Sequence, residues 1–111
     1  MVGGLIEMSR KWGCPIPCYG HAGDGNLHAT PVMNPEWTLE EWHGKVPQIL
    51  TDMYKLTKDL GGTISGEHGI GHKRKKYMPL VVDEAYLGMV RSIKRALDPN
   101  NVLNPGKIFD V

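Results

Sequence analysis

Glycine is concentrated in two segments of this chain, and these segments limit where helices can form. The chain has 111 residues and 14 glycines, nearly twice the usual share of about 7%. The two segments are G-H-A-G-D-G-N-L-H at residues 20–28 and G-E-H-G-I-G-H at residues 66–72, which together hold four of the five histidines. Because glycine weakens helices and permits tight turns, both segments are expected to be turns or loops.

The first half of the chain carries signals for two helices outside these segments. Residues 2–12 have apolar residues at helical spacing, and Gly13 is expected to end that helix. Thr38 and Glu41 have the spacing of a capping box, which predicts a helix start. Pro47 predicts a kink or a restart of this helix. The helical pattern of apolar residues extends over residues 46–60 and ends at two glycines.

A last helix is expected near the C-terminus. Asp83 is its expected N-cap, and Asp98-Pro99 its expected end. One side of this helix is expected to carry apolar residues: Tyr86, Val90, Ile93 and Leu97.

Two short strands and a third, weaker one complete the expected fold. Residues 14–19 and 27–33 are expected to pair as a hairpin, because Asp24-Gly25 between them is a strong turn signal. Residues 63–65 are a further candidate for a brief strand. The fold class is therefore α+β, with helices packed on a small, mostly antiparallel sheet. The length predicts one domain over residues 1–111. So thin a sheet is expected to need a missing segment or a second subunit, including a homo-oligomer.

Composition excludes several classes of protein. The formal net charge of +1 does not favour nucleic acid as a partner. The sequence has neither a transmembrane run of about 18 to 20 apolar residues nor a signal peptide. Cys14 and Cys18 have the wrong spacing for redox or zinc motifs, so they are expected to be small core residues. We therefore expect a cytoplasmic chain, with contact to a membrane surface only through partner subunits.

The two glycine-rich segments favour a shared metal site. His21 and His28 flank the hairpin turn, where cross-strand positions on one face come within about 5 Å. Two imidazoles and a carboxylate are a known ligand set for Zn, Fe, Mn or Co. The carboxylate could come from Asp24 or from Glu67, and Glu67 is preferred because Asp-Gly turns need no metal. His68 then lies beside the ion as a general base.

The same residue types also have ordinary structural explanations. A single histidine is usually structural or solvated, and His43, in a polar helical stretch, is interpreted that way. The basic run at residues 73–76 is usually a solvated face, although one member could hold a carboxylate substrate. The segment G-I-G-H-K lacks the spacing of a phosphate-binding loop.

Three motifs in this order, GHAGDGNLH, SGEHGIG and DPNNVLNPGKIF, resemble the C-terminal domain of FAD-linked oxidases of the vanillyl-alcohol oxidase type. Within that group the resemblance is to the D-2-hydroxyacid dehydrogenase branch, which includes glycolate oxidase, D-lactate dehydrogenase and D-2-hydroxyglutarate dehydrogenase. This resemblance covers essentially the whole chain. It implies a part of a ferredoxin-like cap domain, and an FAD-binding domain that is absent from these residues.

The resemblance also implies roles for individual residues. Positions His21, His28 and Glu67 match the ligands of a divalent metal, usually zinc or manganese, and His68 matches the catalytic base. The tail residues 104–107, with Asn104 first, match a segment near the flavin. Thr30 stands where some relatives have a substrate-binding asparagine, and Arg74 is the candidate from the basic run for the substrate carboxylate. Another substrate-binding cation of the relatives lies upstream of this region.

Together these expectations describe one part of an active site that oxidises a 2-hydroxy acid, namely the metal and the base without the FAD. A metal ion would hold the substrate hydroxyl, His68 would take its proton, and hydride would pass to FAD on a separate domain or chain. Two other classes stay open at this point. One is a small metallohydrolase in which His68 activates a metal-bound water, and the other is a non-catalytic metal-binding or oligomerising module.

Overall fold

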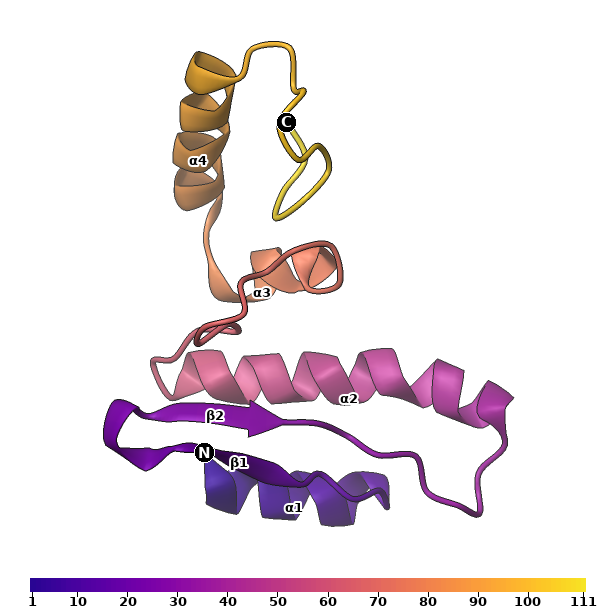
Figure 1. The fold of residues 1–111 in the computed structure, drawn as a ribbon. Coiled ribbons are helices and arrows are strands. Elements are labelled where there is room, and N and C mark those ends of the chain that lie inside the picture. The colour runs from indigo at the N-terminus through magenta and orange to yellow at the C-terminus, as the bar shows by residue number, and fades with distance from the viewer. The chain divides into compact units, whose positions relative to one another are not determined.

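A computed structural model describes all of residues 1–111, which form two compact units (Figure 1). The first unit spans residues 1–62 and the second spans residues 63–111. Four α-helices and one two-stranded antiparallel sheet confirm the α+β class. The break between the units follows Gly61-Gly62, which the sequence predicted only as the end of a helix. None of the helices combines the length and the apolar composition that crossing a bilayer requires.

Helices α1 (Val2–Trp12) and α2 (Leu39–Asp59) of the first unit form as the local signals predicted. Gly13 ends α1 in the left-handed conformation, with φ of 67°. At the start of α2, Thr38 and Glu41 make both reciprocal bonds of a capping box. Pro47 neither ends nor restarts this helix, which continues past it for a total of 21 residues. The expected restart at residue 46 was therefore wrong.

The hairpin consists of β1 (Cys18–His21) and β2 (Asn26–Ala29), and both strands are shorter than predicted. The prolines explain the difference, because a proline has no N–H for the ladder. Beyond the strands, Thr30 and Val32 still donate to the carbonyl oxygens of Pro17 and Pro15, at 3.2 and 2.8 Å. The two prolines cannot donate in return, so the pairing continues there with half of its bonds.

The loop of the hairpin has four residues rather than the two of an Asp-Gly turn. A 3-10 turn, η1 (Ala22–Asp24), is followed by Gly25 in the left-handed conformation, with φ of 68°. The strands pair with His21 opposite Asn26 and with His28 opposite Tyr19. The two histidines are therefore diagonal neighbours, and the expectation of directly facing positions was wrong.

The core of the first unit lies between its two helices and the chain around the hairpin. Leu5 of α1 and Ile49 of α2 are 1% and 0% exposed. Cys14 is buried in the same cluster and Cys18 packs against it, which confirms both cysteines as small core residues. The tryptophans also pack against the cluster: Trp12, Trp37 and Trp42. This packing places the hairpin on a rigid hydrophobic base.

The second unit contains a short turn η2 (Lys75–Tyr77) and helices α3 (Met78–Val81) and α4 (Glu84–Leu97). Asp83 caps α4 by accepting a hydrogen bond from the Tyr86 N–H, and the helix ends before Asp98, both as predicted. The brief strand predicted at residues 63–65 does not form. No strand of this unit is present to pair with it, and an unpaired strand is not stable.

Most of the apolar side chains of α4 are exposed. Only Leu87 of this helix is buried. Tyr86, Ile93 and Leu97, which the sequence placed on one side of the helix, are 45%, 52% and 79% exposed. The helical spacing alone does not decide which face is buried, because burial depends on what packs against the helix.

Candidate metal and substrate site

The hairpin presents its polar side chains on one face. Cys18 and Ala29, which face each other across the strands, pack against the core. Because side chains alternate along a strand, the neighbours of Cys18 and of Ala29 in each strand point away from the core. That second face carries His21 and Thr30, both exposed, and His28, which is partly buried.

The two imidazoles of this face come from diagonal positions of the hairpin. Diagonal neighbours across an antiparallel pair have Cα atoms about 7–8 Å apart, and long side chains span that separation. Imidazole nitrogens bind Zn at about 2.0–2.1 Å. Both side chains belong to the class of ligands that zinc accepts. Asp24, the alternative carboxylate ligand, lies in η1 and is exposed.

Tyr19 fixes the orientation of the His28 ring. The two rings stack, with centroids 4.9 Å apart and planes inclined by only 11°. Tyr19 itself is 71% exposed, so its ring restricts the histidine while remaining largely in solvent. The sequence analysis did not identify this residue. Its signal was the register, because a residue directly opposite a candidate ligand is the one that contacts it.

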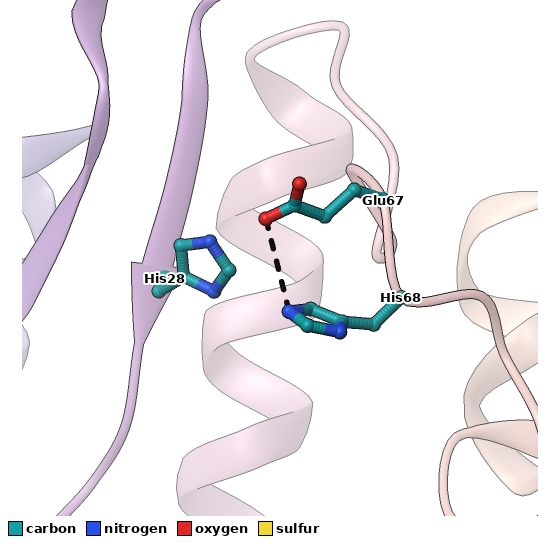
Figure 2. A group of neighbouring side chains, drawn as sticks. All are labelled: His28, Glu67 and His68. Carbon is teal, nitrogen blue, oxygen red and sulfur yellow. Dashed lines mark ion pairs between the residues drawn. The ribbon is translucent and has the colours of Figure 1, made fainter.

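Glu67 and His68 lie together in the second glycine-rich segment, in the second unit. Their charged atoms, Glu67 Oε1 and His68 Nε2, are 3.7 Å apart (Figure 2). Both side chains are exposed, by 47% and 67%. Gly69 and Gly71 next to them have φ of 76° and 56°, which explains why this loop needs glycine.

Arg74 closes the same loop. Its guanidinium group donates a 2.9 Å hydrogen bond from Nη1 to the carbonyl oxygen of Gly69. A guanidinium group has five N–H donors, so this bond leaves others for a carboxylate. The residue predicted to bind substrate therefore also holds the backbone beside Glu67 and His68.

The C-terminal tail is organised by Asp98, which sequence reasoning treated only as a helix stop. Its carboxylate accepts hydrogen bonds from the Val102 and Leu103 N–H groups, each at 2.9 Å, and from the Lys94 ammonium. Lys94 first, and then these backbone donors, lower the pKa of Asp98 from 3.8 to about 2. The spacing of Asp98 to the two N–H groups, four and five residues, resembles a local capping pattern and could have been recognised.

Asn104 follows directly after this anchored turn. It is exposed and has a positive φ of 50°, a conformation that asparagine tolerates better than most residues. Lys107, three residues later, is exposed as well.

The donor set of the chain also fits a divalent metal. The candidates are imidazole nitrogens and a carboxylate oxygen, a combination that suits zinc and manganese. His21 and His28 are held by the hairpin of the first unit, and Glu67 by the loop of the second.

Comparison with known proteins gives one family and several relatives. The family of FAD linked oxidases, C-terminal domain, matches residues 1–108. The glycolate oxidase subunit GlcD of Bacillus subtilis is 35% identical over 109 residues, which are 98% of this chain and 23% of that protein. A D-lactate dehydrogenase of Archaeoglobus fulgidus is 37% identical over 102 residues, 92% of this chain and 22% of that protein.

A third relative is the D-2-hydroxyglutarate dehydrogenase of Stutzerimonas stutzeri, 33% identical over 94 residues, 85% of this chain and 20% of that protein. The chain thus spans between 20% and 23% of the length of these three relatives. The match confirms the family expected from the three motifs, and the family implies FAD as its cofactor. This chain belongs to the family of FAD-linked oxidases, in which it corresponds to the C-terminal domain.

Proposed function

We propose that this chain is the substrate and metal domain of an FAD-linked dehydrogenase that oxidises a D-2-hydroxy acid to a 2-oxo acid. The observation that carries the proposal is the polar hairpin face, on which His21 and His28 lie as diagonal neighbours opposite the packed face. The names of three relatives also support the proposal, because they give glycolate, D-lactate or D-2-hydroxyglutarate as the substrate.

In this proposal His21, His28 and Glu67 hold one divalent ion, zinc or manganese. The ion, when bound, supplies a positive charge that lowers the pKa of the substrate hydroxyl. The hairpin holds its two imidazoles through the hydrophobic core, and Tyr19 restricts the ring of His28. The loop glycines set the backbone on which Glu67 is presented.

His68 is the proposed general base. Histidine is the side chain that most often acts as a general base in enzymes. His68 would take the hydroxyl proton of the substrate at Nε2, the atom that lies 3.7 Å from Glu67. Its 67% exposure leaves room for a substrate and for the return of the proton to water.

Thr30 and Arg74 are the proposed contacts to the substrate. Thr30 follows β2 on the same face as His28, and its hydroxyl offers one donor and two acceptors. Arg74 would bind the substrate carboxylate with the N–H groups that it does not use on Gly69.

FAD would be bound mainly by a domain or partner chain outside these residues, and Asn104 is the contact proposed from this chain. The flavin supplies the hydride acceptor. The role of Asn104 is to position one edge of that ring, and the bonds of Asp98 hold the turn that precedes it.

Activity of a chimera tests this proposal. The matched 109 residues of the Bacillus subtilis relative would be replaced by this chain, and dye reduction measured with D-lactate, glycolate and D-2-hydroxyglutarate. We expect activity with at least one acid. We also expect a decrease in kcat of about 10²–10⁴-fold for His68→Asn, the usual contribution of a general base. His43→Asn, an exposed histidine in α2, is the matched control and should leave kcat unchanged.

Two results would contradict the proposal. One is an active chimera in which His68→Asn keeps the parent kcat. The other is metal-dependent hydrolysis of esters or amides by the 111-residue chain alone, which would favour a metallohydrolase.

A further inference from the structure

The second unit contains a cleft of about 490 Å³ that shares no residue with the proposed metal ligands. Its charged lining is strongly unbalanced. Four permanent cations and one carboxylate line it, and one of the cations, Arg91, also pairs with Glu84 at 3.3 Å. These residues are Lys73, Lys75, Lys76 and Arg91, with Asp110 as the only acid. A concave surface with one sign of charge concentrates ions of the opposite sign.

Two of these cations bind the same residue of the C-terminal tail. The Lys75 ammonium donates to the carboxylate of Asp110. Arg91 Nε donates to the backbone carbonyl of Asp110 at 2.9 Å. Lys75 comes from η2 and Arg91 from α4, so a single acidic residue connects two separate elements.

The partners in this contact differ sharply in exposure. The side chains of Lys75 and Arg91 are only 21% and 30% exposed, whereas that of Asp110 is 81% exposed. When the Asp110 carboxylate leaves, Lys75 keeps the carbonyl oxygen of Gly106, at 3.3 Å, as its other bond. A largely buried ammonium without a counter-charge is costly, so another anion is favoured in that place.

The remaining lining is apolar. Met78 and Leu87, 6% and 3% exposed, belong to the second unit's packed interior and reach the cleft. Ile108 and Phe109 bring apolar side chains from the tail directly before Asp110. The tail therefore places an apolar segment and a carboxylate in the cleft together, next to an apolar surface and two cations.

We propose that this cleft binds a small organic anion that has a carboxylate group and an apolar body. The tail residue Asp110 competes with this anion for the cations of the cleft. Lys75 and Arg91 bind the carboxylate by charge-assisted hydrogen bonds, and the apolar lining takes the body of the ligand. Lys73 and Lys76 raise the local anion concentration. Binding of the external anion displaces the Asp110 carboxylate into water, where its 81% exposure already leaves it largely solvated.

Titration of the 111-residue chain, followed by NMR shifts of its backbone amides, tests this site. The probes are phenylacetate, its neutral analogue phenylacetamide, and acetate, which has the charge without the apolar body. We expect saturable shifts with phenylacetate at residues 72–78, 87–91 and 108–110, and affinities lower by about tenfold for the two other probes. Equal affinity of phenylacetamide and phenylacetate would overturn the proposal.

Three variants separate this site from general charge effects. Asp110→Asn removes the internal competitor and should tighten phenylacetate binding several-fold, whereas Lys75→Gln should weaken it by about tenfold. Arg91→Gln should also weaken phenylacetate binding, and it takes the place of Lys75→Gln in the test if that variant fails to fold. Glu7→Gln and Lys58→Gln, exposed residues of the first unit, are matched controls for the charge changes. Unchanged affinity in Asp110→Asn, or losses in the controls as large as in Lys75→Gln, would overturn the proposal.

Discussion

The two units of this chain hold their hairpin and their C-terminal segment by different contacts. In the first unit, Leu5 and Ile49 are almost fully buried within one apolar cluster. In the second unit, charged side chains hold the C-terminal segment: Lys94 and Asp98 anchor its start, and Lys75 and Arg91 bind Asp110 near its end. The difference shows that the histidine-bearing hairpin has a hydrophobic base, whereas the tail beside α4 depends on ionic contacts.

The two units can be distinguished by spectroscopy. All three tryptophans, residues 12, 37 and 42, lie in the first unit. Tryptophan fluorescence therefore reports on the first unit alone, whereas far-ultraviolet circular dichroism reports on the helices of both. A change that affects one signal and leaves the other constant can be assigned to a unit.

Removing core volume from the first unit should have the largest effect. Ile49→Ala deletes a fully buried side chain, and such changes cost about 2–5 kcal/mol of unfolding free energy. Denaturant unfolding followed by tryptophan fluorescence measures this loss. Ile6→Ala, at a 49% exposed position of α1 in the same unit, is the control, with an expected change of about 0.5 kcal/mol or less. Similar losses in both variants would contradict the buried core described for the first unit.

Acid should affect the second unit through Asp98. Its hydrogen bonds stabilise the ionised form and lower its pKa from 3.8 to about 2. The unfolded state binds the proton more readily, so this contribution is complete above about pH 4 and is lost as the pH falls to about 2. We expect circular dichroism to lose helical signal in this window.

The matched variant for this prediction is Asp98→Asn. Without the titrating group, the helical signal should start lower near neutral pH and change less between pH 4 and pH 2. If the parent and the variant lose signal in parallel, Asp98 is not the group that makes the second unit acid-sensitive.

Tyr19 should matter for metal affinity more than for folding. Tyr19→Leu removes the ring stacked on His28, and outer contacts of this kind change metal affinity by about 10–100-fold. Calorimetric titration with zinc measures the change, and denaturant unfolding checks that stability is retained. Tyr86→Leu, at a 45% exposed position of α4, should leave metal affinity unaltered. An equal loss in both variants would argue against a positioning role for Tyr19.

The smallest predicted effect is a difference in thiol reactivity within the first unit. Burial raises the pKa of the Cys14 thiol, and Lys45 offsets part of that rise. Because the thiolate is the reactive form, Cys14 should react with iodoacetamide more slowly than the less buried Cys18. Cys18→Ser should remove the faster reaction. Equal rates for both cysteines would mean that the core around Cys14 opens readily.

Local signals in the sequence were sufficient to predict where helices begin and end. They were not sufficient for features that depend on contacts between residues far apart in the chain. Gly13, the Thr38–Glu41 box and the Asp83 cap were predicted, because each acts within one turn of its helix. The family was also predictable from three motifs.

Features that depend on packing or pairing could not be predicted in the same way. The exposed stripe of α4 depends on which elements pack against it, and the diagonal offset of His21 and His28 depends on the length of the hairpin loop. The contact of Tyr19 with His28 depends on the partner across the strand. The Lys75 and Arg91 contacts join residues 35 and 19 positions apart.

Calorimetric titration of the 111-residue chain with zinc tests most directly the proposal that His21, His28 and Glu67 bind one metal ion. We predict one ion per chain, with affinity reduced by at least about tenfold in His28→Ala and likewise in Glu67→Gln. His43→Ala should bind zinc as the parent does. Stoichiometric binding of unchanged affinity in either His28→Ala or Glu67→Gln would contradict the proposal.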